Sequence, residues 1–371
     1  MTQSGWRTLF TKDALPDTSH WPDCLSELKI AFSHIQSSQD LATLKGWQPE
    51  LVRALQAVDI PAWRISQVVS DHNDWIYRLT IRESVAEMHQ QGWGYPPCDF
   101  CVLTLGSGAR HESLLGPDQD NAMILEDYPQ DRHVEIDTWF QSLAERFTDK
   151  LHQAGIPLCK GHVMARWPLW RKPLKEWCEQ MRLWSGRRTV KLVQLSNILL
   201  DFAPVYGNTL LAEQLRQYLL VLMPSAGLFL DEMNALQDET RVALDRFDRL
   251  VGDDQEAPHQ HAINLKRQGL LPLQAALRLF SLRKGVAQQD CRGRLQALQS
   301  MGFLSASKAE CLEEALSLLL ALLLESQMKA VELNRTPDGW VDRRELSESR
   351  LVQLKMALIE IRSLQKLAAT A

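Results

Sequence analysis

The chain lacks a cysteine framework, a secretion leader and any apolar run long enough to cross a membrane. Its seven cysteines show no framework spacing, and Met1–Trp6 contains neither a basic region nor an apolar region, so we expect reduced thiols and a cytoplasmic protein. The longest apolar run, Ala315–Leu324, is interrupted by Ser317 and falls short of the roughly 18 residues that span a bilayer. We therefore expect a buried helix there and no membrane partner.

The chain also lacks an excess of positive charge. A net charge of −5 and a pI near 6.1 argue against binding to a phosphodiester backbone, although Arg166–Lys175 interleaves basic and aromatic residues. We expect no nucleic-acid partner. The chain has no Gly-x-Ser-x-Gly elbow and no Gly-x(4)-Gly-Lys-Ser/Thr loop, which excludes the hydrolases and nucleotidases built on these motifs. Cys98 and Cys101 have no second pair at zinc spacing, so we expect structural thiols.

The pattern of apolar residues predicts an α+β protein in three parts. The 371 residues, of which 45% are hydrophobic, suffice for about two or three domains. We expect an N-terminal helical segment over 1–92, a core with a small mixed β-sheet over 93–207, and a C-terminal helical bundle over 208–371, with almost no strands in the last part.

Several elements of the core can be placed. Phe100–Leu105 and Met123–Leu125 read as strands, and helices are expected from near Asp137 and over Lys172–Trp184. The apolar run Ser196–Leu200 ends in Asp201 and is followed by Pro204 and Gly207. It predicts a short buried strand that delivers a carboxylate to its end.

The most informative stretch runs from Leu105 to Ile124. Asp118 and Asp120 stand at i and i+2, so on an extended segment their carboxylates project from the same face. Gly106 lets the backbone approach a ligand closely, and Ser107 offers a hydroxyl and an N–H to an anion. Carboxylate oxygens suit Mg²⁺, which usually binds through one or two carboxylates plus the phosphates of a nucleotide. The stretch therefore predicts a metal and triphosphate site.

These residues also carry a resemblance. Gly106-Ser107, ten residues and then Asp118-x-Asp120 resemble the signature of the polymerase-beta nucleotidyltransferase superfamily. The fuller pattern Gly-Ser-x-x-Arg-x-Glu-x(5)-Asp-Gln-Asp-Asn-Ala resembles one family of it, often fused to CBS and cyclic-nucleotide-binding domains and related to the protein uridylyltransferases and adenylyltransferases of nitrogen control. The resemblance runs from about residue 60 to the end, through the later blocks Leu158–Ala165 with Trp170, Asp201–Gly207, Leu265–Leu270 and Pro337–Asp342.

The resemblance implies a nucleotidyltransferase core that uses Mg²⁺ or Mn²⁺ and an NTP. Asp118 and Asp120 would hold the ions, and Asp201 matches the superfamily's third carboxylate, which binds one ion and takes the proton of the acceptor. A rival pair, Glu135-x-Asp137, precedes apolar residues at helical spacing, so Asp137 is better read as a helix N-cap.

Five other residues are candidates for binding or support. Arg110 is the best candidate for a phosphate contact, because a planar guanidinium matches phosphate oxygens two at a time. Lys160 lies in the loop 157–166, which would close over the nucleotide. Gly106 and Ser107 would lie at the phosphates. Glu112 is interpreted as a supporting residue.

Two positions depart from the family's pattern. Ala203 stands where an arginine is common, and Asn264 replaces an aspartate before Leu-Lys-Arg. An arginine at 203 would contact phosphate or steady the acid, so its loss bears on catalysis and substrate choice.

The function predicted is transfer of a nucleoside monophosphate, AMP or UMP, from an NTP to a hydroxyl group with release of pyrophosphate. A protein is the expected acceptor. The alternative is a non-catalytic nucleotide-binding module that acts in signalling or regulation through its helices. A small-molecule adenylyltransferase of the antibiotic-modifying type is less favoured, because the sequence reveals no acidic acceptor cleft. The base and the acceptor are not specified by any spacing.

Overall fold

The computed structural model describes residues 10, 17–19, 21, 23–37, 40–187, 189–237, 241–252 and 257–371. The first residues, on which the absence of a leader was inferred, lie outside this set. The chain forms two compact units. One comprises Met1–Ile60, Arg64–Met181 and Ile198–Tyr218, and the other comprises Pro61–Trp63, Arg182–Asn197 and Leu219–Ala371. The three-part division at residues 92 and 207 stays a prediction.

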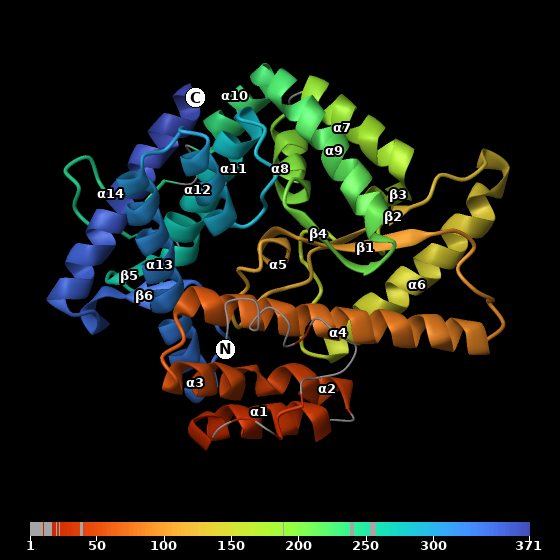
Figure 1. The fold of residues 1–371 in the computed structure, drawn as a ribbon, viewed down its shortest axis with the longest axis horizontal. Helices are drawn as coiled ribbons and strands as arrows, with labels where there is room; N and C mark the ends of the chain where they lie inside the picture. Colours follow the sequence, from red (N-terminus) through yellow and green to blue (C-terminus); the bar gives the residue numbers. More distant parts are fainter. Residues whose placement is uncertain are drawn as a thin grey trace. The chain divides into compact units, whose positions relative to one another are not determined.

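The first unit is built on a mixed four-stranded sheet (Figure 1), which confirms the predicted α+β class. Its order is β3-β2-β1-β4. β1 pairs antiparallel with both β2 and β4, and β2 pairs parallel with β3. The strands span Phe100–Leu105 (β1), Asn121–Leu125 (β2), Arg171–Pro173 (β3) and Phe202–Gly207 (β4).

This topology gathers three chain segments at one edge of the sheet. Because β1 is antiparallel to its two neighbours, its last residue lies beside the first residues of β2 and β4. Leu105 N–H donates to the carbonyl of Asp120 (3.0 Å), and Gly106 N–H donates to the carbonyl of Asp201 (2.9 Å). The backbones of these two aspartates therefore flank the end of β1.

Helices cover both faces of the sheet. α4 (Ala62–Gln90) and α6 (His133–Gln153) pack on one face, where a continuous apolar core joins them to alternate strand residues such as Phe100 and Val102. On the other face, Trp177 of α7 (Leu174–Arg187) donates to the Met123 carbonyl (3.0 Å), and Arg216 of α9 (Thr209–Ser225) donates to that of Phe202 (2.6 Å). The N-terminal part adds α1 (Ser26–Ser37), α2 (Leu41–Leu44) and α3 (Gln48–Ala57).

Two sequence predictions about secondary structure are wrong. Ser196–Leu199 belongs to a helix, α8 (Val190–Leu199), and the strand β4 begins only after Asp201. The buried residues Val193, Ser196 and Leu199 recur every third position, which is helical spacing that a five-residue run does not reveal.

Asp137 is not a helix N-cap, because α6 already begins at His133. Its carboxylate instead accepts hydrogen bonds from Arg171 Nε (3.1 Å) and Nη2 (2.9 Å). The part after residue 208 also contains a two-stranded antiparallel sheet, formed by β5 (Ala262–Asn264) and β6 (Trp340–Asp342).

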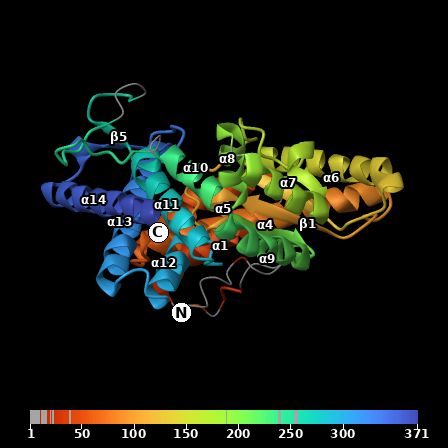
Figure 2. The same cartoon turned by 90° about the horizontal axis from the view of Figure 1, so that it is seen from above.

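The second unit is mainly helical. Figures 1 and 2 show that its longer helices pack beside one another, and α11 lies against α10, α12 and α14. Its core is rich in leucine, with Leu316, Leu319 and Leu323 fully or almost fully buried. Its main helices are α10 (Gly227–Gln237), α11 (Leu271–Arg283), α12 (Cys291–Ser300), α13 (Ala306–Glu332) and α14 (Glu348–Thr370).

Among the described residues, no single helix has the length and apolar composition of a membrane span. One pair, Thr209–Ser225 with Gly227–Leu236, meets that test when taken together, but the pair is bent by 89°.

Gly207 at the end of β4 should not tolerate a side chain. Its φ is +91°, and a Cβ there would lie 2.1 Å from the carbonyl oxygen of Phe100. We expect Gly207→Ala to lower the free energy of unfolding by about 2 kcal/mol or more. Gly46→Ala, where nothing lies within 4 Å of the added Cβ, is the matched control for urea unfolding. Equal losses in the two variants would contradict this account.

His72 on α4 should make the fold sensitive to acid. Burial, and to a smaller extent Lys45, lowers the pKa of His72 to about 3 from 6.5. The unfolded chain therefore binds more protons than the folded chain between these values, so stability falls as the pH falls through this window.

We expect His72→Phe to reduce the stability loss between pH 6.5 and 4.5 by about 2 kcal/mol. Urea unfolding at both pH values measures it. An exposed histidine, His89, provides the control, and His89→Phe should follow the wild type. A His72→Phe protein with the wild-type pH dependence would show that this side chain is not the source.

Candidate functional site

The segment that leads into β2 alternates between anchoring and outward side chains. Gln119 and Asn121 are fully buried. The Gln119 amide donates to the carbonyls of Thr148 (2.8 Å) and Ile156 (2.9 Å), and Asn121 Oδ1 accepts from the Ala165 N–H (2.8 Å). Since side chains of an extended segment alternate in direction, these anchors turn Asp118 and Asp120 to the opposite side.

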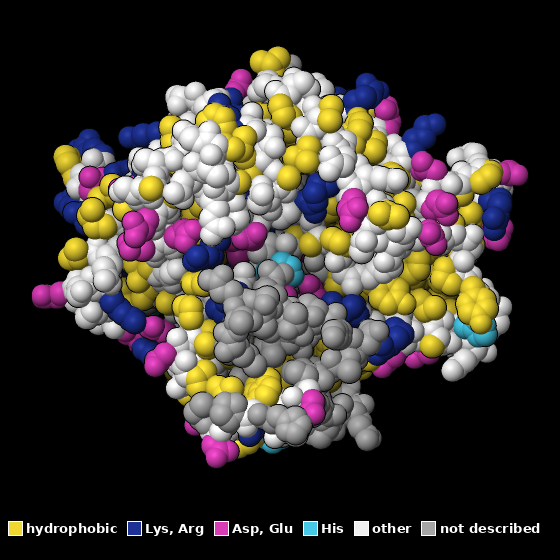
Figure 3. All heavy atoms as spheres, in the orientation of Figure 1, with side chains coloured by type: hydrophobic (Ala, Val, Ile, Leu, Met, Phe, Trp, Pro, Cys, Tyr) yellow, Lys and Arg dark blue, Asp and Glu magenta, His cyan; other side chains and the backbone are white. Residues whose placement is uncertain are grey.

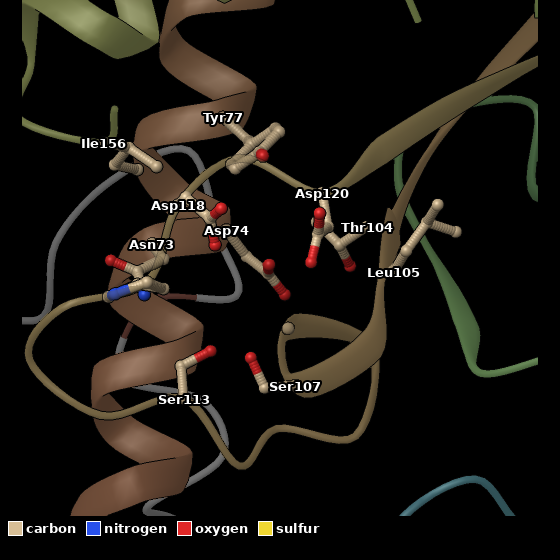
Figure 4. A pocket seen from close by; sticks show the side chains of 12 residues that line it. Asn73, Asp74, Tyr77, Thr104, Leu105, Ser107, Ser113, Asp118, Asp120 and Ile156 are labelled. Atoms are coloured by element: carbon tan, nitrogen blue, oxygen red, sulfur yellow. The ribbon is translucent and has the colours of Figure 1, made fainter. Parts of the chain in front are cut away.

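Asp118 and Asp120 open into a pocket (Figure 4), whose empty space, open solvent included, is about 350 Å³. Figure 4 shows the carboxylates of Asp118, Asp120 and Asp74 directed toward the same space, with Ser107 and Ser113 across from them. The remaining lining residues are Asn73, Tyr77, Thr104, Leu105, Gly108, Pro117 and Ile156.

The turn after β1 forms one wall of the pocket. Gly106 starts α5 (Gly106–Ala109), a single helical turn, with φ +57°. A Cβ at Gly106 would lie 3.7 Å from Asp120 Oδ2, in the space beside that carboxylate. The next residue, Ser107, then reaches the pocket. The Gly-Ser pair therefore brings a hydroxyl close to the two aspartates.

Asp201 and Arg110 form a buried ion pair behind this wall. Arg110 Nη1 lies 2.6 Å from Asp201 Oδ2, and its Nε lies 3.1 Å from Glu112 Oε2. The three side chains are only 5%, 0% and 7% exposed. A guanidinium between two carboxylates has its donors directed at them, so this geometry favours a structural role for Arg110 over the predicted phosphate contact.

The predicted site residues are thus only partly brought together. Ser107, Asp118 and Asp120 line one pocket, and Gly106 lies next to Asp120. The side chain of Asp201 is not among the residues that line it, although its backbone adjoins Gly106. Lys160 is exposed and also lies outside the lining.

Sequence reasoning missed the contribution of α4. Asn73, Asp74 and Tyr77 of this helix line the pocket, and the Tyr77 hydroxyl accepts a hydrogen bond from Asn121 Nδ2 (3.3 Å). Burial raises the pKa of Tyr77, with Asp120 and Asp74 adding to the effect, so the phenol stays neutral. The signal in the sequence was a polar run, 71–74, which interrupts the apolar residues of α4 and is itself buried.

The donor atoms near the pocket suit a divalent cation. Asp118, Asp120 and Cys159 place one ligand atom each within 4.8 Å of one another. Burial raises the pKa of the Cys159 thiol to about 11, and Asp120 also contributes, so the thiol stays protonated at neutral pH. Such an oxygen-rich set matches the preference of Mg²⁺ and Mn²⁺.

The charged side chains on the described surface are mixed in sign. On the face in Figure 3, Lys and Arg side chains alternate with Asp and Glu, and the described side chains make no broad patch of one sign there.

Two family models match the chain. Residues 47–191 match the family described as "Putative nucleotidyltransferase DUF294", and residues 227–371 match "Putative nucleotidyltransferase substrate binding domain". The first match contains Ser107, Asp118 and Asp120, whereas Asp201 lies between the two matched segments. No curated protein matches the chain.

Proposed function

The chain belongs to this nucleotidyltransferase family, and from that premise we propose that it transfers AMP or UMP from an NTP to a hydroxyl group of a protein. The acceptor oxygen would form a bond to the α-phosphorus while the bond to the bridging oxygen of the β-phosphate breaks. Pyrophosphate would leave with that electron pair, and the hydroxyl proton would pass to a carboxylate.

One observation carries this proposal. The paired carboxylates of Asp118 and Asp120 face the same pocket as the Ser107 hydroxyl. A triphosphate needs a cation to neutralise it and a donor to fix its oxygens, and reactions at phosphorus depend mainly on such positioning.

Asp118 and Asp120 are the residues that would hold Mg²⁺ or Mn²⁺, which fits the donor set described above. When bound, the cation would supply charge neutralisation at the phosphates. The Ser107 hydroxyl would donate to a phosphate oxygen. Asp74 adds a third carboxylate to the pocket.

Asp201 remains the proposed third catalytic carboxylate. Its backbone carbonyl accepts from Gly106 N–H (2.9 Å), so Asp201 lies next to the turn that carries Ser107. Arg110 would act as the positioning residue of Asp201. The side chain of Lys160 is exposed, so Lys160 would reach the nucleotide only by movement of its loop.

The acceptor is proposed to bind to the second unit. The substrate-binding model covers 227–371, a helical segment with several exposed apolar side chains, including Leu228, Val352 and Met356. We propose that a macromolecular acceptor would contact these side chains.

A direct experiment is incubation of the purified protein with each NTP, labelled at the α-phosphate, and Mg²⁺ or Mn²⁺, with and without extract of its host. The proposal expects label on a protein and released pyrophosphate with ATP or UTP. Nucleotide binding without turnover under all conditions would instead support the non-catalytic module, and label on a small molecule would overturn the protein acceptor.

A further inference from the structure

A second group of metal-binding side chains lies beside the pocket. Asp71 and Asp74 of α4 and His111, which follows α5, place one ligand atom each within 4.8 Å of one another. Asp71 is 3% and Asp74 9% exposed, and the His111 side chain is 20% exposed. This group is therefore largely removed from solvent, unlike the acidic clusters that are common on protein surfaces.

The local structure explains why the three residues meet. Asp71 and Asp74 are three positions apart, so they lie on one face of α4. His111 has φ 54°, and its N–H donates to the Gly108 carbonyl (3.0 Å), so the chain turns back after α5. The next segment is fastened to α4, because Ser113 N–H donates to Ser70 Oγ (2.9 Å) and Ser66 Oγ donates to the Ser113 carbonyl (2.8 Å).

We propose that Asp71, Asp74 and His111 bind a divalent transition-metal ion, a site separate from that of Asp118 and Asp120. His111 Nδ1 and Asp71 Oδ1 lie 3.0 Å apart. Two ligands at about 2.1 Å from an octahedral ion are separated by about 3.0 Å, so this pair needs little rearrangement to share one. Asp74 also lines the pocket, which gives the ion a route from solvent and leaves coordination positions for water.

The imidazole determines which ions this site would take. Nitrogen ligands favour Mn²⁺, Fe²⁺, Co²⁺ and Zn²⁺ over Mg²⁺, whereas carboxylates alone accept Mg²⁺ readily. We therefore expect the Asp71–Asp74–His111 site to bind Mn²⁺ more tightly than Mg²⁺. The proposal does not depend on nucleotidyl transfer, because binding of the ion is measured without any NTP.

The test uses the full-length Asp118→Asn/Asp120→Asn protein, in which the other carboxylate pair is removed. After treatment with a chelator, Mn²⁺ is titrated and followed by electron paramagnetic resonance. We expect one Mn²⁺ per chain, with the nitrogen modulation of a coordinated imidazole in the pulsed spectrum. Adding Asp71→Asn or His111→Ala should weaken binding at least about tenfold, and His111→Ala should remove the modulation.

His259, in the other unit, provides the matched control. Its imidazole lies 3.4 Å from the Asp342 carboxylate, and that contact includes no second aspartate. His259→Ala should leave both Mn²⁺ affinity and the nitrogen modulation unchanged. Absence of the modulation in the parent protein would overturn the proposal even if His111→Ala fails to fold. Unchanged Mn²⁺ affinity in Asp71→Asn and His111→Ala would also overturn the proposal. The contact between His111 and Asp71 would then be an ordinary ion pair.

Discussion

Asp118→Asn/Asp120→Asn should keep its fold and lose at least about a thousandfold in the rate of pyrophosphate release. Both side chains are at least partly exposed, so their amides cost little stability. Without the two charges the proposed cation would lose two of its ligands beside the triphosphate, and charge stabilisation of this kind contributes several kcal/mol at a phosphoryl centre. The measurement is the initial rate with saturating NTP and metal, with circular dichroism as the check of folding.

The control is the other acidic pair at the same spacing. Glu135→Gln/Asp137→Asn changes an i, i+2 pair on α6, whose Asp137 contacts Arg171 of β3 and is not directed into the pocket. This variant should keep the wild-type rate. If the Asp118/Asp120 variant releases pyrophosphate at that rate as well, the proposed role of the two carboxylates is wrong.

The sequence predicted the local geometry of the candidate site. β1 occupies the predicted residues, and Asp118 and Asp120 lie together because the two-residue alternation of an extended segment is local geometry. Gly106 and Ser107 follow β1 directly, so their place beside Asp120 required only that β2 return along β1. Each of these features depends on fewer than about 25 residues of chain, which is the range that periodicity and turn signals reach.

Features that depend on distant segments were not predicted. Asp201 pairs with Arg110 across 91 residues of sequence, and no spacing rule indicates that this guanidinium would meet an aspartate instead of a phosphate. Asp74 reaches the pocket from a helix whose polar run could equally have faced solvent. Burial of that face is decided by packing against β1 and α6, which is tertiary information.

Removal of Arg110 should cause the largest loss of stability among single substitutions at the site. Arg110 is 5% exposed and contacts Asp201 and Glu112, which are 0% and 7% exposed. Arg110→Met would leave two carboxylates buried without this cation, and such a loss typically costs about 3–5 kcal/mol. We expect a decrease of that size in the free energy of urea unfolding, together with lower transfer activity, because Asp201 loses the group that fixes its position.

Two comparisons separate charge from packing. Arg110→Met/Asp201→Asn also removes one of the two buried carboxylates, so it should recover part of the stability lost in Arg110→Met. It should remain inactive if Asp201 is catalytic. Arg132→Met breaks an exposed ion pair with Glu135, whose side chains are 45% and 66% exposed, and should leave stability close to that of the wild type. If Arg110→Met is as mild as Arg132→Met, the buried guanidinium is not what holds Asp201 in place.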